Sequence, residues 1–274
     1  AEQLIAESTG KLGTGVLPVV AGPASPEATL GAPDVLVIRL VAADADLQLG
    51  ENEVAIAGGL ATQMMVWEFA TAVAGRLLGI NPFDQPDVEA AKIAARGLLD
   101  AQPEPTPANF TDGAIEVRGG AWLGDAATAA EAVGALLAEL GPDNYLSVQA
   151  YFDRLAYASF EGVRDELAAV SGRPVTFGWG PRFLHSTGQF HKGGPAIGVF
   201  LQVTAASAAD LAIPDRPFTF GELISAQAAG DAQVLSEHGR PVLRLHLTDR
   251  AAGVKQLQEL VTSLAGQAAS STES

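Results

Sequence analysis

The chain has no cysteine, and this absence excludes disulfide frameworks, thiolate metal sites and thiol nucleophiles. Basic residues are scarce: 16 Lys and Arg stand against 32 Asp and Glu, for a formal net charge of −16. This imbalance argues against nucleic acid and anionic membrane surfaces as partners, because both would repel most of the protein. No run of about 18 apolar residues occurs, so no membrane-spanning helix is expected. The first residues also lack the basic head and apolar run of a signal peptide.

What is present indicates a folded protein. The chain has 274 residues, 48% of them hydrophobic, which is enough for one large domain or two small ones with a sizeable core. Without cysteine the composition suits a reducing compartment, and we predict a cytoplasmic location. The sequence opens on Ala1 rather than methionine and resembles the middle of a helix, so we expect it to begin inside a longer polypeptide.

The first hundred residues predict a small set of elements. β-branched runs predict strands at 34–41 and 54–57, and short or periodic apolar patterns predict helices at 1–8, 60–78 and 87–100. The helix at 60–78 is apolar on nearly all sides, which predicts that it is buried. Glycines at 10, 13 and 15 end the first helix.

Alternating prolines at 103, 105 and 107 predict a stiff linker over residues 102–109. Strand and helix patterns alternate after it, and this alternation is typical of a doubly wound α/β domain with a mostly parallel sheet and flanking helices. We therefore predict two subdomains, at 1–101 and 110–266. The Ser- and Ala-rich residues 267–274 are predicted to form a disordered tail.

Two single residues stand out as chemical candidates. Lys92 falls within the apolar stripe of the helix at 87–100, which favours a functional role. The alternative is that its aliphatic stem lies along the apolar surface, or that its ammonium group forms an ion pair with Glu89. Glu7 stands near the end of the first helix. A solvated side chain paired with Lys11 at i,i+4 is the alternative to a functional role.

A Gly- and Pro-rich stretch at 180–195 concentrates polar and cationic side chains, inside a segment, 167–209, that contains no Asp or Glu. It follows a predicted strand, which is where α/β sheets place ligand sites. We expect a loop that binds an anion such as a phosphate or carboxylate, or a structural loop that pairs with the chain's own acids. A zinc site is not expected, because the histidines have neither cysteine partners nor a nearby acid. The candidate binding residues are Arg182, His185, Ser186, Gln189, His191 and Lys192.

Two segments of the chain resemble a known family. Residues 3–11 (Gln-Leu-Ile-Ala-Glu-Ser-Thr-Gly-Lys) and 81–92 (Asn-Pro-Phe-Asp-Gln-Pro-Asp-Val-Glu-Ala-Ala-Lys) resemble the two signature stretches of phosphoglucose isomerase. Residues 67–75 and the whole second domain resemble, more narrowly, the bifunctional transaldolase/phosphoglucose isomerase fusions of bacteria. The resemblance implies the sugar-isomerase (SIS) architecture and the interconversion of glucose 6-phosphate and fructose 6-phosphate without metal or organic cofactor.

The resemblance also implies roles for particular residues. Glu7 matches the base that moves a proton between C1 and C2 of the open-chain sugar, and Lys92 matches the lysine that assists ring opening. Gln3 and Gln85 match glutamines that contact the substrate. These roles agree with chemistry, since a held carboxylate abstracts a proton next to a carbonyl and a cation stabilises the enediolate.

The chain also departs from the family pattern. The family's ring-opening histidine lies between the two signatures, yet no histidine occurs in residues 1–184. The family's phosphate-binding and arginine segments lie upstream of the first signature. We therefore expect a C-terminal portion with an incomplete site, in which His185 or His191 replaces the missing histidine.

The implied partners are a sugar phosphate, the N-terminal isomerase half, a transaldolase domain and a second copy of the chain. The alternative is a non-catalytic module that binds sugar phosphates or docks another domain.

Overall fold

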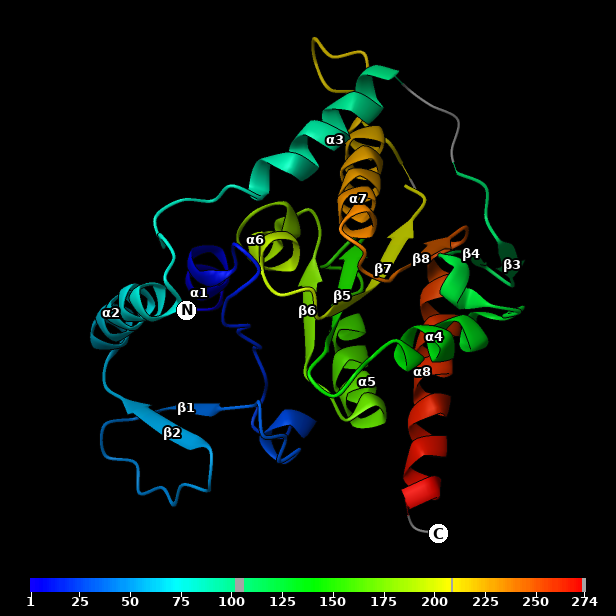
Figure 1. The fold of residues 1–274 in the computed structure, drawn as a ribbon. Coiled ribbons are helices and arrows are strands. Elements are labelled where there is room, and N and C mark those ends of the chain that lie inside the picture. Colours follow the sequence, from blue (N-terminus) through cyan, green and yellow to red (C-terminus); the bar gives the residue numbers. More distant parts are fainter. Residues whose placement is uncertain (102–105, 208, 273–274) are drawn as a thin grey trace.

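The computed structural model describes residues 1–101, 106–207 and 209–272 and shows an α/β protein (Figure 1). A six-stranded sheet has the order β3-β4-β8-β7-β5-β6, and a separate sheet pairs β1 with β2 in parallel. Strands β8, β7, β5 and β6 are parallel, whereas β3 and β4 are antiparallel additions at one edge. The strands are β1 (Val37–Val41), β2 (Glu53–Ala57), β3 (Phe110–Asp112), β4 (Ile115–Arg118), β5 (Tyr145–Tyr151), β6 (Val175–Trp179), β7 (Gly198–Ala205) and β8 (Val242–Leu247).

The helices agree closely with the sequence pattern. Two of them begin with a capping box, in which a threonine and the glutamate three residues later satisfy each other's backbone N–H groups: Thr128 with Glu131, and Thr219 with Glu222. The α-helices are α1 (Glu2–Thr9), α2 (Leu60–Leu78), α3 (Val88–Ala101), α4 (Ala129–Ala138), α5 (Val163–Ser171), α6 (Ser186–Gly193), α7 (Phe220–Glu237) and α8 (Arg250–Thr272). Short 3-10 turns lie at Pro26–Ala28, Ala121–Leu123, Ala158–Gly162 and Arg182–Leu184.

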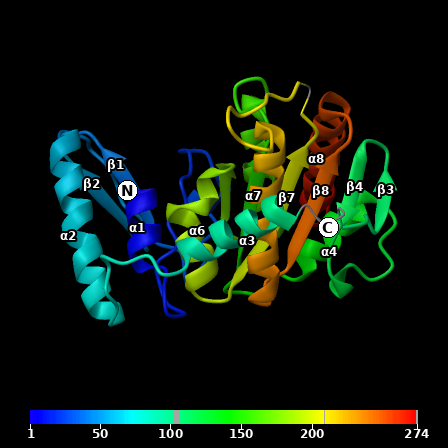
Figure 2. The same cartoon turned by 90° about the horizontal axis from the view of Figure 1, so that it is seen from above.

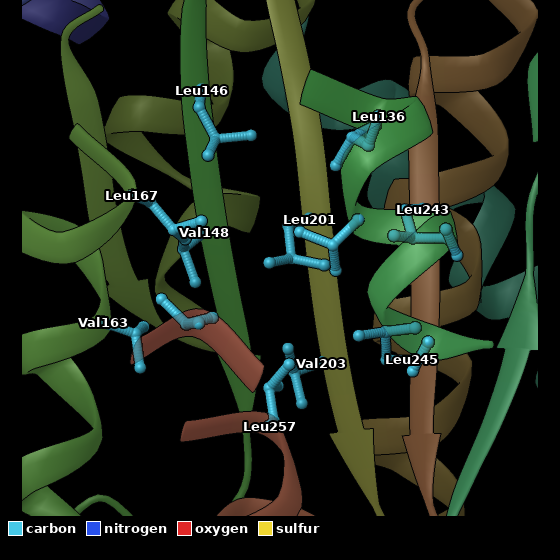
Figure 3. Close-up of a cluster of buried hydrophobic side chains, with 14 of the residues drawn as sticks. Leu136, Leu146, Val148, Val163, Leu167, Leu201, Val203, Leu243, Leu245 and Leu257 are labelled. Carbon is cyan, nitrogen blue, oxygen red and sulfur yellow. The ribbon is translucent and has the colours of Figure 1, made fainter. Parts of the chain in front are cut away.

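The main core lies on one face of the six-stranded sheet. Alternate residues of β5, β7 and β8, such as Val148, Leu201 and Leu245, point toward α4, α5 and α8 and are fully buried there (Figure 3). The prediction of an α/β fold with a mostly parallel sheet and flanking helices is therefore confirmed. The SIS-like assignment stays a prediction.

The opposite face of the sheet is more polar. Ser147, Gln149 and Gln202 alternate with the core residues along β5 and β7 and are buried beneath α6 and α7. Helix α3 lies along the outer side of α7 (Figure 2), where Ala91 and Ala95 approach Gly230 so closely that a Cβ there would stand 2.7 Å from the backbone nitrogen of Ala95. Helices α3 and α1 thus attach the first hundred residues to the helices α7 and α6 that cover the six-stranded sheet.

The structure differs from the sequence predictions at three places. Helix α2 is not buried: Leu60, Phe69 and Leu77 are 78, 67 and 82% exposed. The stretch at 180–195 is not an open loop, because it folds into a 3-10 turn and α6. Helix α8 continues to Thr272, where a disordered tail was predicted from 267.

Half of the predicted linker, 102–109, lies outside the described residues, since 102–105 are not described. Within the described part of the chain, no helix is both long and apolar enough to cross a membrane.

Candidate functional site

The first signature segment forms α1 and the turn that ends it. The Thr9 hydroxyl donates to the carbonyl of Ile5 (2.7 Å) and accepts from the N–H of Val16 (3.0 Å), which fixes the chain as it leaves the helix. The chain reverses at Leu12 and Gly13, which both have positive φ angles, of 55° and 76°. This reversal turns the Lys11 side chain away from solvent.

Lys11 joins the two signature segments. It is only 1% exposed, and its ammonium group donates to the carbonyl of Asn81 (2.9 Å), to the carbonyl of Asp84 and to Asp84 Oδ1 (2.9 Å). The hydrogen bond from Lys11 holds the pKa of Asp84 below its usual value. The pairing of Lys11 with Glu7, given as the alternative role for Glu7, is therefore wrong. Lys11 is instead a buried structural residue, which its place at the end of the first signature did not predict.

Gln189 makes a second junction between the same segments. Its amide nitrogen donates to the carbonyl of Gly10 (2.8 Å) and to Asp87 Oδ2 (2.7 Å), and its amide oxygen accepts from the N–H of Asp87 (2.9 Å). Gln189 is fully buried. Its prediction as a substrate-binding side chain does not fit this geometry, because both ends of the amide already bind the chain itself.

Glu7 and Lys92 lie on different elements around this junction. Glu7, on α1, is half-buried, and no hydrogen bond or ion pair in the described part of the chain involves its carboxylate. Lys92, on α3, is half-buried and lies 3.8 Å from Glu89, as the structural alternative predicted. No ion pair joins Glu7 to Lys92 among the described residues.

The predicted binding residues Gln3, Gln85, Arg182 and His185 lie at the surface. With its amide oxygen facing the guanidinium, Gln3 accepts from Nε and Nη2 of Arg182, both at 2.8 Å. Arg182 also pairs with Glu2 (2.6 Å). Gln85 and His185 are exposed, and His185 stands at the N-cap of α6.

The cationic side chains of the 167–209 segment bind the chain's own acids. Lys192 Nζ lies 2.5 Å from Asp231 Oδ1, with side chains 1% and 0% exposed, and Arg173 pairs with Asp34 (2.5 Å). Ser186, at the start of α6, is also buried. The prediction of an open, flexible anion-binding loop is therefore wrong for Lys192. The alternative interpretation, a structural segment that pairs with the chain's own acids, fits Arg173, Arg182 and Lys192.

His191 lies in a buried aromatic cluster. Its Nδ1 is 2.7 Å from the Tyr145 hydroxyl, and its Nε2 is 3.5 Å from Ser147 Oγ. Burial, together with the nearby cations Lys192 and Arg240, lowers the pKa of His191 to about 3. A neutral imidazole with so low a pKa is a poor general acid near pH 7. His191 therefore does not suit the ring-opening role that the sequence suggested.

We expect His191 to make stability depend on pH. Its pKa falls from 6.5 to about 3 on folding, so the unfolded chain binds an extra proton between these values and stability is lost as the pH falls below 6.5. Urea unfolding of the wild type and His191→Gln at pH 7, 6 and 5 measures this loss. The stability difference between the two proteins should shift by up to about 1.4 kcal/mol per pH unit below 6.5. A difference that is the same at all three pH values would contradict the assignment.

A small pocket lies between α1, α6 and the strands β5 and β6. Part of its lining is polar, and the Thr176 hydroxyl oxygen there is inaccessible to water and has no hydrogen-bond partner among the described residues. Within the same part of the chain, no group of three or more His, Asp or Glu side chains is arranged to hold a metal ion. The polar lining residues of the pocket are Glu2, Ser147, Thr176, Arg182, Thr187 and His191.

Fold and site together define an α/β protein whose two signature segments converge beside α6. No protein-family model matches the chain, and no curated protein matches it. A solved structure of a hypothetical protein from Thermus thermophilus aligns with 96% of this chain and 74% of its own, at 16% identity and a TM-score of 0.43. This similarity carries no inference about function.

Proposed function

We propose that the chain is the C-terminal portion of a cytoplasmic glucose-6-phosphate isomerase within a transaldolase/isomerase fusion. The observation that carries the proposal is the convergence of the two isomerase-like segments. Lys11 reaches the carbonyls of Asn81 and Asp84, and Gln189 joins Gly10 to Asp87. The segments are about 70 residues apart in sequence and come together at the end of the helix that carries Glu7.

The state of Glu7 suits a proton-transfer base. Its carboxylate is half-buried and is not neutralised by any ion pair in the described part of the chain. In the proposal, Glu7 abstracts a proton alpha to the sugar carbonyl and returns it to the neighbouring carbon, once the assembled protein holds its carboxylate in place. Lys92, at the first turns of α3, supplies a cation for the oxygen that gains charge in the enediolate.

The exposed apolar surface supports the partner that this proposal requires. Strands β1 and β2 form a parallel pair, and no other strand of the described residues lies beside them, whereas parallel sheets are usually covered on both faces. Both strands and α2 lie at one end of the molecule, away from the six-stranded sheet (Figure 2). In the proposal, the N-terminal isomerase half covers this surface. The exposed apolar residues of β1, β2 and α2 include Leu40, Val54, Leu60, Met64, Met65, Phe69, Val73 and Leu77.

Reconstitution tests this function. The chain alone, the upstream isomerase polypeptide alone and their mixture are assayed for conversion of fructose 6-phosphate to glucose 6-phosphate in a coupled assay. We expect activity in the mixture or in the continuous protein and none in either part. Activity absent from the continuous protein would contradict the proposal.

A second candidate is a non-catalytic docking module. Arg182 and Lys192 favour it, because both form ion pairs with acids of this chain rather than facing a ligand. The same mixing experiment separates the two candidates, since a docking module would form the complex without isomerase activity.

A further inference from the structure

Gln189, on α6, joins both signature segments through hydrogen bonds. Both donors and the acceptor of this buried amide are used: the donors bind Gly10 and the Asp87 carboxylate, and the acceptor receives the Asp87 N–H. Since glutamine offers two N–H groups and one oxygen, the site matches this side chain group for group. Gly10 follows the helix that carries Glu7, and Asp87 precedes the helix that carries Lys92.

The backbone contact around Gln189 is equally close. A Cβ at Gly193 would lie 2.1 Å from Asp87 Oδ2, and a Cβ at Gly10 would lie 2.3 Å from the Cα of Phe190. The N–H of Gly13 donates to the carbonyl of Gly193 (2.9 Å), so α6 also holds the turn after α1. Helix α6 therefore contacts both signature segments at backbone distance.

We propose that Gln189 is a positioning residue, through which the second subdomain sets the register between the Glu7 helix and the Lys92 helix. This inference rests on the proposed isomerase function for its kinetic consequence, but not for its structural one. Gln189 itself does not contact substrate, because its amide is fully occupied. Its effect on the reaction is exerted through the placement of Glu7 and Lys92, and a misplacement of about 1 Å reduces rate by up to about 100-fold.

Gln189→Glu is the informative substitution, because it keeps the shape but replaces both donors with acceptors that face the Gly10 carbonyl and the Asp87 carboxylate. The matched control is Gln233→Glu, the same change at an exposed position on α7, where Gln233 bonds only Glu237 (2.8 Å) among the described residues. A second variant, Gln189→Glu with Asp87→Asn, returns a donor to the pair and should restore part of what the single change removes.

Two readouts test the proposal in the continuous protein. Kinetics should show kcat lowered about 10–100-fold by Gln189→Glu with KM unchanged, partial recovery in the double variant and no change in Gln233→Glu. Amide hydrogen exchange should show lost protection at Asp87 and Gly13, because repulsion of the new carboxylate from the Asp87 carboxylate and the Gly10 carbonyl separates α6 from both segments. The strands β5 and β7 should stay protected. Unchanged exchange at Asp87 would overturn the proposal, and so would a loss of protection throughout the chain.

The two proposals fail in different ways. If the continuous protein shows no isomerase activity, the isomerase assignment falls, while hydrogen exchange still decides the structural role of Gln189. If Glu7→Gln removes activity and Gln189→Glu leaves kcat unchanged, the positioning role is overturned and the isomerase assignment stands.

Discussion

Under the proposed isomerase function, Glu7→Gln in the continuous protein is expected to abolish proton exchange at C2 of the sugar phosphate while substrate binding remains. Glutamine keeps the size of the side chain but cannot accept the proton, and loss of a general base costs about 10²–10⁴-fold in rate. The carboxylate makes no ion pair or hydrogen bond among the described residues, so its removal should leave the fold intact. Exchange is measured by NMR in D₂O, and binding by calorimetry with the substrate.

The control for this substitution is Glu259→Gln, which removes an exposed carboxylate on α8, far along the chain from both signature segments. This variant should retain wild-type exchange. Retained C2 exchange in Glu7→Gln would contradict the assignment of the base. Loss of both exchange and sugar-phosphate binding would instead make Glu7 a binding residue.

The Lys192–Asp231 pair should give the largest stability effect. Both side chains are almost wholly buried, and their charges lie 2.5 Å apart. Lys192→Met or Asp231→Leu leaves one charge buried beside the sheet without its counter-charge, which is expected to cost about 3–5 kcal/mol of unfolding free energy. The double variant should recover most of this loss, since neither charge remains. Urea denaturation measures all three variants.

The exposed pair Lys255–Glu259 is the matched control. The side chains of Lys255 and Glu259 are 77% and 68% exposed, and Lys255 Nζ lies 3.7 Å from Glu259 Oε1. Lys255→Met should therefore leave the unfolding free energy almost unchanged. If the single Lys192 and Asp231 variants were as stable as this control, the pair would not be the buried ionic contact that the structure shows.

The order and type of most elements followed from sequence periodicity, because strands and helices of this fold have strong local patterns. Strand β5 is an example: its alternate residues Leu146 and Val148 enter the core, and turn residues flank it on both sides. The antiparallel strands β3 and β4 were harder to place, since pairing of β4 with β8 depends on contacts about 130 residues away.

Burial was predicted less well than secondary structure. The apolar composition of α2 predicted a buried helix, but within this chain only Thr71 and Gly75 of α2 are buried. The apolar composition of a helix predicts that its surface tends to be buried, but it does not predict which part of a chain, or which other chain, covers that surface. The predicted cationic loop failed for a related reason: the absence of local acids in 167–209 gave no sign of Asp231, which approaches Lys192 from a distant helix.

The candidate site was only partly predictable from the sequence. Glu7 and Lys92 were singled out from their places in the sequence, and the family resemblance gave them roles. The contacts that join their segments were not predicted. Lys11 and Asp84 lie inside the two quoted signatures, so their pairing could have been suggested by opposite charge. The role of Gln189 depends on three hydrogen bonds to distant backbone and carboxylate groups, and no local pattern encodes such a set.

Solvent deuterium incorporation at C2 of glucose 6-phosphate is the most direct test of the central claim. The measurement uses the wild-type chain joined to the upstream isomerase half that the proposed function requires, in D₂O and without added metal. The proposed function predicts deuterium at C2 at a rate that depends on both polypeptides. Substrate that binds the assembled protein yet keeps its C2 proton would contradict it.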